Sequence, residues 1–396
     1  MSVPFSQMPE HSPLGASGAS RWMKCPGSVM MARGTSDEES EFAALGTFAH
    51  SVGETCLASG QDAWELMTPE QLVTHSTQVV VDSDMANAVQ VYLDAVRKTH
   101  GEWNQGNGWV ERQFYCPSIH EYFYGRSDFT GIVGDTLHVW DYKHGAGVVV
   151  DVVENPQGMY YAVGMLEDLQ LWGTIKSVVI HIVQPRGWHQ DGVHRYWTIP
   201  TASLWQWQEE TLVPAMNRAL ASRDTASGEH CRFCPVRAYA CPQILADFDE
   251  LEELMSILAD KGGADELSET QLGRLLSLHD TAKIAAKAAE STTFNRLQAG
   301  KKVPGRKLVN GRANRAWKDG AETAIKKQFG DEAFESKLLS PAQVDKLPGG
   351  EKLTAEHAFK PEGKLTVAST DDKRMEVSRD TKSMFKDETK AKKGRK

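Results

Sequence analysis

Within the first hundred residues, two stretches of hydrophobic and polar positions repeat with a helical period. In residues 84–100 the apolar side chains form one stripe and the polar ones face away from it. This stripe contains Met85, Ala88, Val89, Tyr92, Leu93 and Val96. Residues 21–57 show a similar spacing, with a break at residues 34–36. The pattern therefore predicts helices before the middle of the chain.

After residue 108 the pattern changes to the short alternation of β-strands. The strand-like stretches are WVERQFYC (109–116), GRSDFTGIV (125–133), TLHVWDYKHG (136–145) and IKSVVIHIVQP (175–185). A helix is predicted from Pro156 to Glu167, between the last two of these strands, and another over residues 203–222. Helix, hairpin, helix and strand in this order predict a mixed α/β fold with a central mixed sheet flanked by helices.

The last third of the chain has a different composition. Residues 244–298 have helical spacing with a break at 262–263, and the chain beyond Gly300 is basic and rich in turn residues. We expect four regions. They are a flexible N-terminus (1–20), a core with a cysteine cluster (21–248), a helical extension with a basic segment (249–318) and a basic, partly disordered region (319–396).

Charge is distributed unevenly. Residues 1–300 carry 20 Lys and Arg against 38 Asp and Glu, whereas residues 301–396 carry 24 against 15. The basic part is suited to a polyanion, which the acidic part would repel unless metal ions intervened. The basic stretch before Trp317, which contains Lys301, Lys302, Arg306, Lys307, Arg312 and Arg315, suits phosphate contact and base stacking, or is a solvated surface.

Neither a membrane span nor a signal peptide is readable. No apolar run reaches about 18 residues, and no basic segment leads into an apolar one at the N-terminus. We expect a cytoplasmic protein with no membrane partner.

The most informative stretch is a predicted hairpin closed by Gly134 and Asp135, a two-residue turn signal. If this turn closes the hairpin, Asp128 lies directly opposite Asp141, with Cβ atoms roughly 4.5–5.5 Å apart. Lys143 shares the face of Asp141 because side chains alternate along a strand. Two facing carboxylates repel each other unless a divalent cation joins them. The alternative is an exposed hairpin with unrelated acids and a salt-bridging lysine.

Two helical pairs flank this hairpin. His50 and Glu54 lie four residues apart, as do Gln157 and Tyr161, so each pair shares a helix face. The first pair suits a metal site or a surface polar pair. The second suits a phosphate or a base edge, or forms a half-buried stripe. Glu111, on the preceding strand, is expected to face solvent, the alternative being an extra acid near the metal.

Cysteine spacing indicates a metal centre. Cys231-x-x-Cys234 is followed by Cys241, and Cys25, which lies outside the core elements, is the best fourth ligand. Cys56 and Cys116 are interpreted as small buried hydrophobes. Four thiolates suit a [4Fe–4S] cluster or Zn²⁺, and unligated thiols are the alternative.

The order H-x-x-x-E, D, D-x-K, Q-x-x-x-Y resembles the RecB-like branch of the PD-(D/E)XK superfamily. The resemblance implies a restriction-endonuclease-like sheet and a Mg²⁺ or Mn²⁺ site held by His50, Asp128, Asp141 and Glu54. It implies catalytic roles for Asp128, Asp141, Lys143 and His50, and substrate binding by Gln157 and Tyr161. The distribution of cysteines resembles the iron–sulfur staple of AddB-type and CRISPR-associated members, which implies that Cys25, Cys231, Cys234 and Cys241 hold a structural [4Fe–4S] cluster.

These motifs predict a metal-dependent DNA nuclease, with exonuclease action expected on DNA ends or single strands. The C-terminal segment resembles that of phage-encoded members, which implies a host bacterial cytoplasm and a setting in phage DNA replication, recombination or processing. Phage recombination or replication proteins are the expected protein partners. The alternative is a non-cleaving DNA-binding or recombination-accessory protein on a nuclease scaffold.

Overall fold

The fold is known from a computed structural model, which divides into two compact units, Met1–Ala282 and Lys283–Lys396. The structure describes residues 11–33, 41–67, 72–74, 77–101, 103, 106–236, 241–261, 263, 265, 267–311, 316–318, 320–333, 341–345, 347, 349–359, 365–369 and 375–377. The units divide within a helix at residue 282, so the expected boundaries at residues 248 and 318 do not coincide with this division.

The first unit is built on a five-stranded mixed sheet with the order β3-β4-β5-β6-β7. Its strands are β3 (Gly108–Tyr115), β4 (Tyr124–Val133), β5 (Thr136–Tyr142), β6 (Ser177–Val183) and β7 (His194–Pro200). β5 and β6 are parallel, and the other neighbours are antiparallel. The predicted mixed α/β class is confirmed, while β7 was not predicted from the sequence.

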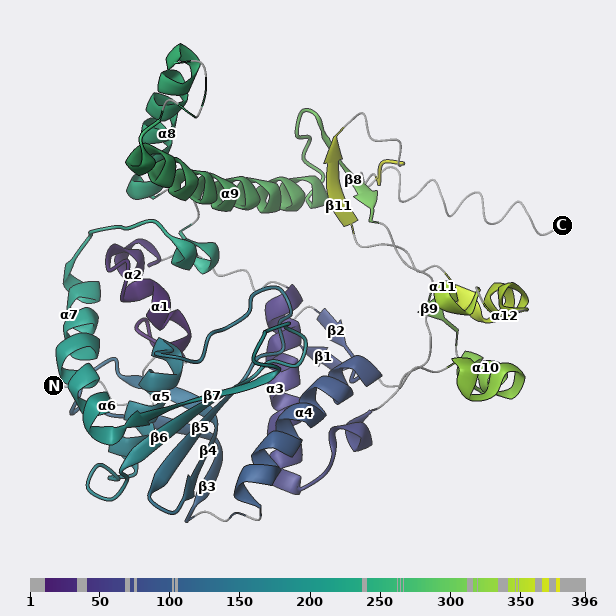
Figure 1. Ribbon diagram of the computed structural model, residues 1–396, viewed down its shortest axis with the longest axis horizontal. Coiled ribbons are helices and arrows are strands. Elements are labelled where there is room, and N and C mark those ends of the chain that lie inside the picture. The colour runs from purple at the N-terminus through teal and green to yellow at the C-terminus, as the bar shows by residue number, and fades with distance from the viewer. Residues whose placement is uncertain are drawn as a thin grey trace. The chain divides into compact units, whose positions relative to one another are not determined.

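Helices cover both faces of this sheet (Figure 1). The helices of the unit are α1 (Ala19–Trp22), α2 (Gly27–Met31), α3 (Glu41–Ser59), α4 (Ser83–His100), α5 (Pro156–Asp168), α6 (Thr201–Trp207), α7 (Val213–Ala221), α8 (Pro242–Lys261) and α9 (Glu269–Gln298), the last of which continues into the second unit. A π-helical segment, Gln208–Leu212, joins α6 to α7. A small hairpin, β1 (Leu72–Thr74) and β2 (Thr77–Val79), precedes α4.

Two hydrophobic clusters form the core, one on each face of the sheet. Leu137 and Val139 of β5 belong to the cluster that contains α5, whereas Trp140 and Tyr142 belong to the cluster of α3 and α4. This sorting follows from the alternation of side chains along a strand. It leaves the side chain of Asp141 on the α5 face, at the end of the strand.

Helix α5 connects the parallel strands β5 and β6, and its start is fixed locally. Pro156 occupies the first turn, where its missing N–H costs nothing, and the Asn155 side chain accepts a hydrogen bond from the Gly158 amide at 3.0 Å. Gly158 also allows close packing, because a Cβ there would lie 2.4 Å from Ile180 Cγ2. The predicted helix start at Pro156 therefore places Gln157 in the first turn, next to β5.

The expected loose start of the chain does not extend to residues 11–20. Leu14, Ala16 and Ala19 are buried in the α5 cluster, and the Trp22 indole donates to the Gly15 carbonyl at 3.0 Å. Apolar residues within a Ser- and Gly-rich segment account for this order. Residues 1–10 lie outside the described part of the chain.

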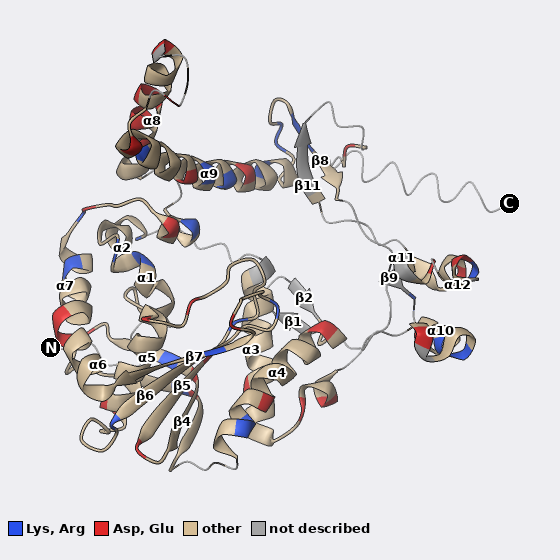
Figure 2. Ribbon diagram, viewed as in Figure 1, with Lys and Arg blue, Asp and Glu red and all other residues tan. Residues whose placement is uncertain are grey.

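Helices α8 and α9 confirm the predicted helical stretch and its break. Acidic side chains gather on α8 (Figure 2), where Arg274 of α9 pairs with Glu250 at 2.6 Å and with Asp247 at 3.2 Å. No helix among the described residues is both long and apolar enough to span a bilayer.

The second unit contains two small sheets and short helices. Its elements after α9 are β8 (Arg306–Asn310), β9 (Ala316–Trp317), α10 (Ala321–Phe329), α11 (Pro341–Val344), α12 (Gly350–His357), β10 (Ala358–Phe359) and β11 (Leu365–Ser369). β8 pairs with β11 and β9 with β10, both antiparallel. Strand β8 thus lies within the predicted basic segment, whereas Arg312, Arg315 and residues 380–396 lie outside the described residues.

Candidate functional site

The predicted hairpin has the expected register. Phe129 pairs with Trp140 and Val133 with Thr136, around the turn at Gly134, whose φ is +63°. Pairing between β4 and β5 ends at Phe129 and Trp140, one step before the two aspartates. There the Tyr142 amide donates to the Asp128 carboxylate at 2.8 Å. The strands therefore separate at Asp128, so side chains from both flanking layers reach this end of the sheet.

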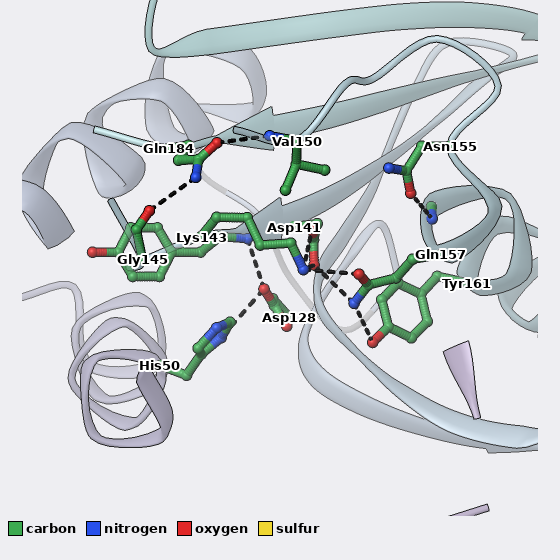
Figure 3. Close-up of polar contacts among 12 residues, drawn as sticks. His50, Asp128, Asp141, Lys143, Gly145, Val150, Asn155, Gln157, Tyr161 and Gln184 are labelled. Atoms are coloured by element: carbon green, nitrogen blue, oxygen red, sulfur yellow. Dashed lines mark hydrogen bonds and ion pairs between the residues drawn. The ribbon is translucent and has the colours of Figure 1, made fainter. Parts of the chain in front are cut away.

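His50, Glu111 and Asp128 form a compact acid group. One ligand atom from each lies within 4.8 Å of the others, an arrangement that can hold a metal ion. The His50 Nδ1 atom lies 3.3 Å from Asp128 Oδ2, and Figure 3 shows the imidazole directed at this carboxylate from α3. Two carboxylates and an imidazole are suitable ligands for Mg²⁺ or Mn²⁺.

The position of Glu111 corrects the expectation that it faces solvent. Its side chain is 10% exposed and pairs with Arg126 at 3.0 Å. Its φ of +47° lies in the left-handed region, which costs a non-glycine residue about 1–3 kcal/mol. The alternation of β3 shifts at this point, because Val110 packs with the α3 and α4 cluster whereas Phe114 packs with α5. A regular strand would place these two side chains on one face.

A second network adjoins the acid group on β5 and α5 (Figure 3). The Lys143 ammonium donates to Asp141 at 2.9 Å and to Gln157 Oε1 at 2.8 Å. The Gln157 amide nitrogen lies 3.3 Å from Asp141 Oδ1 and 3.1 Å from the Tyr161 hydroxyl. Asp141 is 3% exposed. Gln157 and Tyr161 therefore hold the Asp141–Lys143 pair in place in this structure.

The acids respond differently to their surroundings. Burial and then Asp128 raise the pKa of Glu111 to about 7. Burial raises the pKa of Asp141 despite the attraction of Lys143. Burial also acts to raise the pKa of Asp128, but the attraction of His50 and the hydrogen bond from the Tyr142 amide outweigh it, so the pKa of Asp128 is lowered. Burial acts to lower the pKa of His50, but Asp128 outweighs it, so the pKa of His50 is raised. The site thus brings together the carboxylates of Glu111, Asp128 and Asp141, whose basic partners are Arg126, His50 and Lys143 respectively.

Glu54, expected beside His50 as a metal ligand, is exposed on α3 and is not a member of the acid group among the described residues. Glu54 lies four residues after His50 and shares its helix face. Asp128, however, approaches only the His50 end of that face. Glu111 takes the place that the sequence interpretation gave to Glu54.

The four predicted cysteines line one cavity. Cys25 comes from the segment between α1 and α2, and Cys231, Cys234 and Cys241 come from the segment between α7 and α8. The cavity is also lined by Arg21, Ser28, Met31, Thr225, Ala226, His230 and Val236. The segments meet through the backbone as well, because the Gly27 amide donates to the Asp224 carbonyl at 2.8 Å. A Cβ on Gly27 would lie 2.5 Å from the Arg223 carbonyl oxygen.

The family DUF2800, described as a protein of unknown function, matches residues 11–375. The chain belongs to this family. A solved structure titled "Crystal structure of SSO0001" is similar at 13% identity and a TM-score of 0.30, covering 60% of this chain and 90% of that one.

One buried polar cluster was not predicted. His138, His181 and His194 form the histidine row, in which successive rings are hydrogen-bonded at 2.9 and 3.0 Å across β5, β6 and β7. The Trp140 ring stacks on His181 with centroids 3.8 Å apart, and its indole donates to His100 at 3.0 Å. The sequence signal was the alternation of aromatic rings along β5, opposite the face of Asp141.

Proposed function

We propose that this protein is a divalent-cation-dependent DNA nuclease of the RecB-like type that hydrolyses phosphodiester bonds during DNA processing or recombination. The observation that carries the proposal is the acid group of His50, Glu111 and Asp128 next to the Asp141–Lys143 pair. Carboxylates as close together as those of Glu111 and Asp128 fit a bound cation, because such a cation relieves their repulsion.

Each residue of the site has its own role in the proposed reaction. His50, Glu111 and Asp128 hold the cation, and Asp141 joins them from β5. When bound, Mg²⁺ or Mn²⁺ polarises the phosphate and makes a water molecule a better nucleophile. Lys143 donates to the phosphate oxygens where negative charge develops. Gln157 fixes the Lys143 ammonium at 2.8 Å, and Tyr161 braces Gln157.

The test uses end-labelled single- and double-stranded DNA with Mg²⁺ or Mn²⁺ and with EDTA. Wild-type protein is expected to release nucleotides or fragments only with the metal, and Asp141→Asn and Lys143→Ala are expected to abolish this release. The matched controls are Asp135→Asn and Lys176→Ala, because this exposed ion pair of 2.8 Å lies at the hairpin turn. DNA binding without cleavage by the wild-type protein would instead identify a non-cleaving accessory protein.

The cysteine cavity supports a structural [4Fe–4S] cluster as part of the proposal. Three of the thiolates come from one short segment and the fourth, Cys25, from a segment about 200 residues earlier in the chain. Four thiolates in one cavity can bind a [4Fe–4S] cluster or Zn²⁺, and this distribution is less typical of structural zinc sites, which commonly pair two Cys-x₂₋₄-Cys knuckles.

Anaerobic purification tests the cluster. We expect visible absorbance and four irons per chain, both lost in Cys25→Ser. The control is Cys116→Ser, since the Cys116 thiol donates to the Gly164 carbonyl at 3.6 Å away from the cavity and serine retains a donor. A colourless protein with one zinc per chain would contradict the iron–sulfur assignment and leave the nuclease proposal intact.

A further inference from the structure

Tyr92 of α4 has a buried hydroxyl that makes no hydrogen bond among the described residues. Its side chain is 2% exposed and is part of the α3 and α4 cluster. A buried hydroxyl without a partner costs about 1–3 kcal/mol relative to one that is paired. The position of the Tyr92 hydroxyl relative to the acid group explains why it is buried without a partner.

The Tyr92 ring packs against β5 and against α3, the helix that carries His50. It stacks on Tyr142 of β5 with ring centroids 5.2 Å apart. On its other side a Cβ placed on Gly53 of α3 would lie 3.5 Å from Tyr92 Cε1. Gly53 follows His50 by three residues, which is nearly one helical turn. A methyl group at position 53 would make an ordinary van der Waals contact with the ring, so the phenol packs directly against the helix that carries His50.

Within the acid group, Asp128 is the carboxylate that accepts a hydrogen bond from Tyr142, the residue on which Tyr92 stacks. Its contacts with the His50 ring and with the Tyr142 amide both use Oδ2. After burial itself, Asp128 is the largest influence that raises the pKa of Tyr92, followed by Glu111. The Tyr142 ring on which Tyr92 stacks also contacts the His50 ring, with centroids 5.5 Å apart, and its backbone amide donates to Asp128, so the phenol lies next to a residue that contacts two members of the acid group.

We propose that Tyr92 is a positioning residue of the acid group, whose hydroxyl donates a hydrogen bond to Asp128 when that carboxylate binds a divalent cation. The inference rests on the proposed function and adds a residue to it. Carboxylates that ligate metals are commonly hydrogen-bonded by neighbouring groups, and loss of such a partner typically lowers metal affinity or activity 10–100-fold.

The experiment measures Mn²⁺ affinity by titration calorimetry and the unfolding temperature of the metal-free full-length protein. Tyr92→Phe removes only the hydroxyl. It is expected to raise the Kd for Mn²⁺ about 10-fold or more and to leave the metal-free unfolding temperature unchanged or slightly higher. The matched control is Tyr160→Phe, whose hydroxyl donates to the Tyr124 carbonyl at 3.2 Å in the core. It should lower the unfolding temperature and leave the Kd unchanged.

The outcomes separate this inference from the proposed function. Equal Mn²⁺ affinity in wild type and Tyr92→Phe would overturn the role of Tyr92 and leave the nuclease proposal standing. A fall in the metal-free unfolding temperature as large as that of Tyr160→Phe would show that the hydroxyl has a structural role. Wild-type protein that binds no Mn²⁺ would overturn both proposals.

Discussion

The sheet of the first unit carries two buried polar groups, the histidine row and the acid group. In the histidine row each ring is neutral, since burial lowers the pKa values of His138, His181 and His194, and each hydrogen bond joins one ring nitrogen to another. In the acid group Glu111 and Asp128 lie together, and the Tyr92 hydroxyl beside them has no partner in the described part of the chain.

The difference indicates what each group requires. Neutral imidazoles are both donors and acceptors, so they satisfy one another without a change in net charge. Carboxylates only accept, so a buried pair of them needs an external cation or donors. The rings of the histidine row therefore satisfy one another and stabilise the fold. The carboxylates of the acid group depend instead on Arg126, His50 and the Tyr142 amide, and a bound cation would add to these partners.

The largest expected effect is on catalysis. Asp128→Asn retains the size of the side chain and removes its charge, so we expect the rate of Mn²⁺-dependent DNA cleavage to fall at least 1000-fold, equivalent to about 4 kcal/mol. His138→Asn in the histidine row should leave the rate within about threefold. Equal losses in both variants would remove the functional distinction between the two groups.

The next effect is on stability. His181 is 4% exposed and stacks on Trp140, and His181→Ala removes this packing together with two ring hydrogen bonds. We expect it to lower the free energy of unfolding by about 3 kcal/mol, measured by urea denaturation. His50→Ala should change the same quantity by less than about 1 kcal/mol. A more damaging His50→Ala would mean that the acid group is structural.

A smaller effect, an increase in the stability of the metal-free protein, is expected from substitution of Glu111. Because burial raises the pKa of this carboxyl to about 7, its ionised form opposes folding above that pH. Glu111→Gln should therefore stabilise the metal-free protein by about 2 kcal/mol at pH 8. Saturating Mn²⁺ should reverse the order of the two unfolding temperatures, because the wild type binds the ion more tightly. An unchanged order would argue against Glu111 as a ligand.

The smallest effect concerns pH. Burial lowers the pKa of His100 to about 4, below the value of about 6.5 in the unfolded chain. The unfolded chain therefore binds more protons between these values, and stability falls as the pH falls. We expect a loss of about 1 kcal/mol from this residue between pH 7.5 and 5.5. The comparison of Glu111→Gln with Glu111→Gln/His100→Gln avoids the opposing titration of Glu111. If the stability of both variants depended on pH in the same way, the predicted contribution of His100 would be contradicted.

The sequence predicted those features that local rules determine. The turn at Gly134 set the hairpin register, the alternation on β5 put Asp141 and Lys143 together, and the Pro156 signal brought Gln157 to the same place. Cysteine spacing identified the four residues of one cavity.

What escaped prediction depends on non-local packing. The inward position of Glu111 follows from its left-handed conformation, which no rule of alternation anticipates. The histidine row joins residues that are 43 and 13 positions apart, so only the strand order brings them together. Tyr92 looked like one more member of an apolar stripe, because its sequence position does not reveal where its hydroxyl points.

The backbone contact at Gly27 also affects how the cysteine cavity is held together. The Gly27 amide donates to the Asp224 carbonyl, so these distant segments meet through their main chains as well as through Cys25 Sγ, to which the Ala226 amide donates at 3.4 Å. A larger residue at position 27 would therefore push the two segments apart without removing a single sulfur, and its effect would reach every ligand of the proposed cluster at once.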